Sequence, residues 1–112
     1  MPLWHVPIYR RIELQLTIRY YGFFSAVTKK LSEQVESDDG LTVKGLIEYL
    51  ARTYGYRFEK LCFIRPLYSD RDYVNICINT LDLNAAKKFP NGLDTALSGG
   101  DVVSFGVMGG AA

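Results

Sequence analysis

The chain has 112 residues, with 13 basic and 12 acidic side chains and a formal net charge of +1. This length allows one domain and is too short for two. The balanced charge argues against a protein that binds nucleic acid through bulk electrostatics. No stretch reaches the roughly 18 apolar residues of a membrane span. We therefore expect one globular domain in the cytoplasm, with neither nucleic acid nor a membrane as partner.

Residues 1–11 lack the basic start and apolar core of a signal peptide. Pro2 and Pro7 favour an extended lead-in. Cys62 and Cys77 have no CxxC spacing, and the only histidine of the sequence is His5. This pattern predicts neither a metal site nor a Cys–His nucleophile, so both cysteines are interpreted as reduced, small hydrophobic residues.

The first regular element predicted is a strand. Apolar and polar residues alternate over residues 12–20, which is the period of a half-buried strand. Residues 31–36 are predicted as a second strand that forms a hairpin with the first. The connection, residues 23–30, is longer than a tight hairpin turn and is expected to be a loop with room for a bulge.

The next element predicted is a helix over residues 43–54, because its apolar residues recur at helical spacing. Thr42 is expected to cap its start, and Gly55 to end it with positive φ. Gly45 inside the helix is interpreted as a point of close approach to the sheet. Residues 56–72 are expected to be a loop with at most one short helical turn.

The C-terminal half is predicted to contain two or three strands. Residues 73–79 alternate again, and residues 81–84 are expected to return as a short edge strand. Leu93, Ala96 and Leu97 fit a short helical turn. Residues 102–107 are predicted as the last strand, with Val103, Phe105 and Val107 on one face.

This order of elements predicts an α+β protein with the ubiquitin-like β-grasp fold. We expect a mixed four- to five-stranded sheet with one main helix packed on one face. The last strand is expected beside the first, so that the chain leaves from the centre of the sheet. The β-grasp domain then covers residues 12–107, followed by a free tail over residues 108–112.

Three stretches resemble one family. Residues 74–79 (VNICIN) resemble its strand motif, residues 92–103 (GLDTALSGGDVV) resemble its Gly-Asp turn, and Gly109-Gly110 resembles its terminal glycine pair. The family is that of the MoaD/ThiS sulfur carriers, which includes the small subunit of molybdopterin synthase and the cysteine-biosynthesis carrier CysO. The resemblance covers roughly residues 12–110.

The resemblance implies a carrier or small subunit of a complex rather than an enzyme acting alone. A ubiquitin-activating-type enzyme would use ATP to adenylate the carboxylate of Gly110, and sulfur transfer would convert it to a thiocarboxylate. A large subunit or sulfur-acceptor enzyme would then take the sulfur, for molybdopterin, thiamin or cysteine synthesis. No cofactor is expected on the chain itself. Gly109 and Gly110 would let the tail enter a narrow channel.

Partner binding is predicted for apolar residues near the tail, namely Phe105, Val107 and Met108. For Phe105 and Val107 an alternative interpretation remains open, since both also fit the core-facing side of the last strand. Met108 is expected to be exposed.

Two features depart from the family pattern. Ala111 and Ala112 follow Gly110, so a JAMM-type zinc peptidase would have to cut between Gly110 and Ala111. Gly110 also lies nine residues after Asp101, closer than the second glycine of related carriers lies to their Gly-Asp turn. Either the tail is shortened and trimmed, or the glycines have moved inward and sulfur carriage is lost. The second interpretation makes the chain a non-catalytic subunit of a molybdenum or tungsten enzyme or pathway.

The sequence contains no evident acid–base pair or phosphate-binding loop. Glu33, Glu36, Asp38 and Asp39 are close in sequence, but a solvated hairpin edge and turn explain them.

Overall fold

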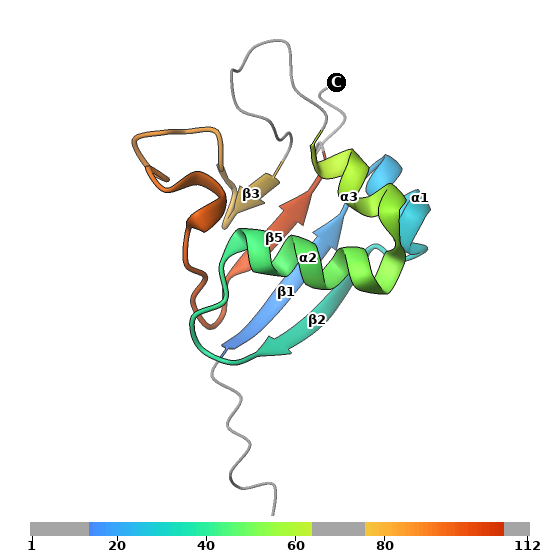
Figure 1. Cartoon of the computed structure of the whole chain (residues 1–112), viewed down its shortest axis with the longest axis horizontal. Coiled ribbons are helices and arrows are strands. Elements are labelled where there is room, and N and C mark those ends of the chain that lie inside the picture. Colours follow the sequence, from blue (N-terminus) through green and yellow to red (C-terminus); the bar gives the residue numbers. More distant parts are fainter. Residues whose placement is uncertain (1–13, 64–75, 107–112) are drawn as a thin grey trace, which may run out of the picture.

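The computed structural model describes residues 14–63 and 76–106. These form a five-stranded mixed sheet in the order β2-β1-β5-β3-β4. The strands are β1 (Leu14–Tyr20), β2 (Ser32–Ser37), β3 (Ile76–Ile78), β4 (Leu81–Asp82) and β5 (Val102–Phe105). Only the pairing of β1 with β5 is parallel. The predicted β-grasp arrangement is confirmed, with the last strand beside the first and at the centre of the sheet (Figure 1).

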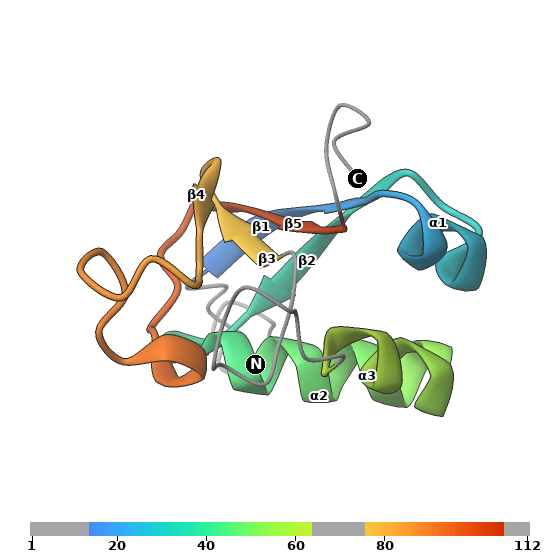
Figure 2. The ribbon, with the colours of Figure 1, turned by 90° about the horizontal axis from the view of Figure 1, so that it is seen from above.

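The main helix is α2 (Val43–Tyr54), and it lies across one face of the sheet (Figure 2). The side-chain oxygen of Thr42 accepts a hydrogen bond from the backbone N–H of Gly45 at 3.1 Å, which confirms the predicted cap. Gly55 has φ 96° and its N–H donates to the carbonyl of Ala51. The predicted role of Gly45 is wrong. A Cβ there would meet the side chain of Leu41 at 3.0 Å rather than any atom of the sheet.

Two short helices extend the fold beyond the sequence prediction. The segment expected to be a hairpin loop contains α1 (Phe23–Thr28), and the segment after Gly55 forms α3 (Tyr56–Cys62). In each helix the buried residues are four positions apart: Phe24 and Thr28 in α1, Phe58 and Cys62 in α3. This spacing brings both side chains onto one face of a helix, and two positions are too few to show a period in the sequence.

The smaller elements of the C-terminal half also differ from prediction in extent. The helical turn is a 3₁₀ helix, η3 (Gly92–Asp94), that ends before Ala96. Ala96 instead forms an extended bridge with Thr42. β4 is shorter than expected, and β5 ends at Phe105 rather than Val107. The predictions for residues 1–13, 64–75 and 107–112 lie outside the described residues.

The core lies between α2 and the sheet. β1 alternates between buried and more exposed residues, with its apolar side facing the helix. The fully buried residues with the largest side chains are Tyr20, Phe58, Phe105, Leu16, Ile18, Leu46, Ile47, Leu50, Ile76, Leu83, Val43 and Val103. Within the described residues, no helix is long and apolar enough to cross a membrane.

Candidate functional site

The point at which the chain leaves the sheet is the end of β5. β5 lies between β1 and β3 and pairs with both through Phe105, opposite Tyr20 on one side and Ile76 on the other. After this pair the backbone N–H of Tyr21 donates to the carbonyl of Phe105 at 2.8 Å. β1 and β5 run in the same direction, toward the end of the sheet where α1 and α3 lie (Figure 1). The predicted residues Val107, Met108, Gly109, Gly110 and Ala111 follow and lie outside the described residues.

Gly106 fixes the exit of the chain. Its φ is 108°, a region that residues with a Cβ rarely adopt. A Cβ at this position would lie 2.5 Å from the carbonyl oxygen of Tyr21 and 2.9 Å from its Cβ. Glycine is therefore required by both the backbone conformation and the space available. The role of Gly106 was not predicted, although an isolated glycine inside a strand pattern is a known sign of a bend or close backbone approach.

Phe105 is a core residue. Its side chain is 0% exposed, and its ring lies 5.2 Å from that of Phe58, 5.6 Å from that of Phe24 and 6.2 Å from that of Tyr20. The predicted partner-binding role of Phe105 is therefore wrong, because a ring closed in by three others has no surface to offer. Its contribution is to anchor the end of β5 beneath α1 and α3.

The start of β5 is held by polar contacts that explain the sequence motifs. Asn79 is in the left-handed region with φ 51°. Its side-chain N–H donates to Asp101 Oδ1 at 2.9 Å, and its side-chain oxygen accepts from the N–H of Val102 at 2.9 Å. Asp101 Oδ2 accepts from the N–H of Ser98 at 2.8 Å. The asparagine of one motif and the aspartate of the other thus form a clamp between two loops, at the opposite end of β5 from the tail.

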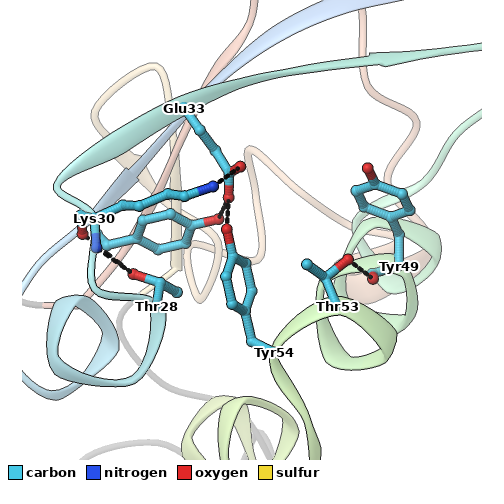
Figure 3. Close-up of polar contacts among 7 residues, drawn as sticks. Thr28, Lys30, Glu33, Tyr49, Thr53 and Tyr54 are labelled. Carbon is cyan, nitrogen blue, oxygen red and sulfur yellow. Dashed lines mark hydrogen bonds and ion pairs between the residues drawn. The ribbon is translucent and has the colours of Figure 1, made fainter.

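One acidic residue has a different environment from the one predicted. The Glu33 carboxylate accepts hydrogen bonds from the hydroxyls of Tyr20 and Tyr54, both at 2.5 Å. It also forms an ion pair with Lys30 Nζ at 3.1 Å (Figure 3). Its side chain is 19% exposed, so the expectation of a solvated edge is wrong for this residue. The other three acidic residues, Glu36, Asp38 and Asp39, are exposed, as expected for a solvated edge and turn.

The Glu33 cluster is structural in character. Burial alone would raise the pKa of Glu33, but the hydrogen bonds from Tyr20, Tyr54 and Lys30 hold it below its ordinary value. Burial and the adjacent carboxylate raise the pKa of Tyr20 far above that of a free tyrosine. A carboxylate with three donors is poorly placed to take a proton from a substrate. The cluster therefore ties β1, β2 and α2 together.

The cysteines have the character predicted for them. Both are free thiols; Cys62 is fully buried and Cys77 is partly buried. Burial raises the pKa of each thiol, and nearby carboxylates (Glu59 for Cys62, Asp82 for Cys77) raise it further. Such thiols are poor nucleophiles. Among residues 14–63 and 76–106, no group of His, Cys, Asp or Glu side chains is arranged to hold a metal ion.

The fold is similar to those of small β-grasp proteins of known structure. A protein designated molybdopterin converting factor, subunit 1, from Pyrococcus furiosus is 25% identical, with 81% of this chain and 93% of that chain covered and a TM-score of 0.62. Urm1 from Trypanosoma brucei is 21% identical, with 89% and 99% covered and a TM-score of 0.59. Small archaeal modifier protein 1 from Haloferax volcanii is 14% identical, with 81% and 93% covered and a TM-score of 0.57.

The sequence itself matches no protein-family model and no curated protein. The similarity therefore rests on structure, and for identities this low it establishes the fold. The predicted resemblance to the MoaD-type proteins is confirmed on that basis.

Proposed function

We propose that the protein is a sulfur carrier whose reactive group is the carboxylate of Gly110, exposed after removal of Ala111 and Ala112. The observation that supports this most is the position of β5. It is the central strand, it leads directly to the C-terminal residues, and Gly106 ends it with a bend against Tyr21. The similarity to a protein designated molybdopterin converting factor, subunit 1, favours molybdopterin synthesis as the branch.

The chemistry needs an activating partner. A carboxylate oxygen of Gly110 attacks the α-phosphorus of ATP and pyrophosphate leaves, which gives an acyl adenylate. Hydrosulfide then attacks the carbonyl carbon, a C–S bond forms, the C–O bond to AMP breaks, and a thiocarboxylate results. The activating enzyme supplies the ATP site, a sulfur-acceptor enzyme or large subunit receives the sulfur, and a JAMM-type peptidase performs the trimming. The role of this chain is to be recognised and to present Gly109-Gly110.

The test is an intact-mass measurement. The full chain is incubated with a processing peptidase, an activating enzyme, ATP and sulfide, beside a known carrier as positive control. The expected product has lost both alanines and has exchanged one oxygen for sulfur. A chain made without residues 111–112 should react without the peptidase, whereas one lacking residues 109–112 should not react. Failure of the chain ending at Gly110, while the known carrier reacts, would refute the proposal.

A second function is favoured by one specific observation. Gly110 lies closer to Asp101 than the family pattern expects, and the Asp101 clamp fixes that reference point in the fold. The alternative is a non-catalytic β-grasp subunit of a molybdenum or tungsten enzyme or pathway. Deleting residues 109–112 should leave its cellular role intact in that case and abolish it for a sulfur carrier.

A further inference from the structure

A groove separates the outer sides of α1 and α3. It has a volume of about 380 Å³ and is lined by Phe23, Ala26, Val27, Arg57, Lys60 and Leu61. On the inner side the two helices are in contact, with the rings of Phe24 and Phe58 5.3 Å apart. The helices are thus packed together at the core and open toward solvent. Phe105, the one predicted site residue that the structure describes, does not line this α1–α3 groove.

The floor and one wall of the groove are apolar. Phe23 is 79% exposed, which is unusual for a phenylalanine, and Ala26 lies one turn further along α1 on the same side. Val27 and Leu61 are partly buried and pack against the core. A large aromatic ring at the mouth of an apolar groove is a common feature of protein-binding surfaces.

The other wall carries only positive charge. Arg57 and Lys60 are exposed, lie three residues apart on α3, and are the charged residues among the described ones that line the groove. Glu59, between them in the sequence, does not line it. Lys60 Nζ lies 5.9 Å from the ring centre of Tyr56. Neither Arg57 nor Lys60 forms an ion pair with the described residues. Two cations that form no ion pair within residues 14–63 and 76–106 therefore lie next to an apolar groove.

We infer that the α1–α3 groove binds an acidic, amphipathic segment of a partner protein. The segment would place one or two large apolar side chains between Phe23 and Leu61 and turn carboxylates toward Arg57 and Lys60. Grooves between helices commonly accept an amphipathic helix in this way. The charges would provide orientation and a faster encounter, and the apolar contact most of the affinity.

The groove also lies close to the start of the tail. Phe105 contacts Phe24 of α1 and Phe58 of α3 directly, and Gly106 follows it. A partner seated in the groove would therefore be held beside the point at which the chain leaves the sheet. The inference does not depend on sulfur transfer, since it requires neither Gly109-Gly110 nor their activation.

The test uses the full chain, labelled with ¹⁵N, and three synthetic peptides. The first is an amphipathic helix with leucines on one face and glutamates beside them, the second has lysine in place of glutamate, and the third is a scrambled form of the first. We expect the glutamate peptide to shift the amide signals of α1 and α3, and the other two to bind at least about tenfold more weakly.

Matched variants locate the site. Phe23→Ala and the double variant Arg57→Glu/Lys60→Glu should each weaken binding of the glutamate peptide by about tenfold or more. Leu31→Ala is the apolar control, because Leu31 is 77% exposed and does not line the groove. Lys44→Glu with Arg52→Glu is the charge control on α2. All six positions are exposed, so unchanged melting temperatures should show that folding is intact.

Five outcomes would overturn the inference. The lysine peptide could bind as well as the glutamate peptide, or the shifts could fall outside α1 and α3. Vesicles containing phosphatidylserine could shift α1 and α3 while the glutamate peptide does not, which would indicate a membrane surface. Concentration-dependent self-association lost in Phe23→Ala would indicate a second copy as occupant. Peptide binding seen only after truncation at Gly106 would assign the groove to the chain's own tail.

Discussion

The two ends of β5 are fixed by different kinds of contact. At its start, the side chains of Asn79 and Asp101 clamp two loops through hydrogen bonds with each other and with the backbone. At its end, Phe105 is enclosed by aromatic rings, and Gly106 presses against the backbone of Tyr21. A buried ring contributes several times more to stability than an exposed hydrogen bond. The end from which the tail departs is therefore the more strongly anchored one.

The largest effect is expected for Phe105→Ala. Removing a fully buried ring from contact with three others should lower the free energy of unfolding by about 3–5 kcal/mol. Urea unfolding followed by tyrosine fluorescence or circular dichroism measures this change. Phe23→Ala is the matched control, because its ring is 79% exposed and its loss should change stability by less than about 0.5 kcal/mol. Equal effects of the two variants would show that the buried ring of Phe105 does not anchor the end of β5.

The next largest effect is expected for Gly106→Ala. The added Cβ would collide with the Tyr21 carbonyl, and φ 108° is strained for alanine, so we expect a loss of about 2–3 kcal/mol. Gly100→Ala is the control: it has a positive φ of 89° but nothing within 4 Å of the added Cβ. The difference between the two variants, measured by urea unfolding, isolates the contact with Tyr21. If Gly106→Ala is as stable as Gly100→Ala, the backbone at position 106 tolerates a side chain and this prediction is wrong.

The sequence predicted the parts of the fold that repeat a pattern over several residues. The nine-residue alternation before Tyr20 and the apolar stripe of α2 both extend far enough to show their periods, and both elements are observed. α1 and α3 each bury only two residues, so the sequence of neither helix shows a helical period of apolar residues. For the same reason the α1–α3 groove between them was not predictable.

The candidate site was predicted less completely than the fold. Phe105 fitted both a core strand and a docking surface, because an apolar residue in the last strand has the same spacing in both cases. Only its contacts with Phe24 and Phe58, which are distant in sequence, decide between them. The motifs around Asn79 and Asp101 carried the resemblance to the MoaD-type proteins but belong to the opposite end of β5 from the tail. These motifs are therefore explained by the contacts between the two loops, and they carry no information about the tail.

A smaller effect is expected at the start of β5, for Asn79→Ala. The variant loses two exposed hydrogen bonds and places alanine at φ 51°, for a combined loss of about 1–2 kcal/mol. Asn79→Gly removes the same hydrogen bonds but accepts the backbone conformation. The difference between the two variants separates the amide contacts from the conformational preference. If Asn79→Ala destabilises the protein as much as Phe105→Ala, the two ends are equally anchored and the comparison fails.

The smallest effect is expected for the pH dependence of stability, through the buried Tyr20 beside the end of β5. Burial and Glu33 raise the pKa of Tyr20 in the folded protein, whereas in the unfolded chain it titrates near its ordinary value of about 10. Above about pH 10 the unfolded state therefore loses a proton that the folded state keeps, so the unfolded state is favoured and stability falls as pH rises. One such group contributes at most about 1.4 kcal/mol per pH unit. Tyr54, Cys62 and Cys77 also have raised pKa values and add to the decline with the same sign.

Tyr20→Phe isolates the contribution of Tyr20. The variant should be less stable at neutral pH, because Glu33 loses one of its donors, yet its stability should fall less steeply between pH 10 and about pH 11. Unfolding by urea at several pH values measures both quantities. Tyr49→Phe is the control for removing a tyrosine hydroxyl from the surface, since Tyr49 is 44% exposed. An equal slope in the wild type and in Tyr20→Phe would mean that Tyr20 ionises in the folded protein, and that the tail end of the sheet admits water despite its aromatic packing.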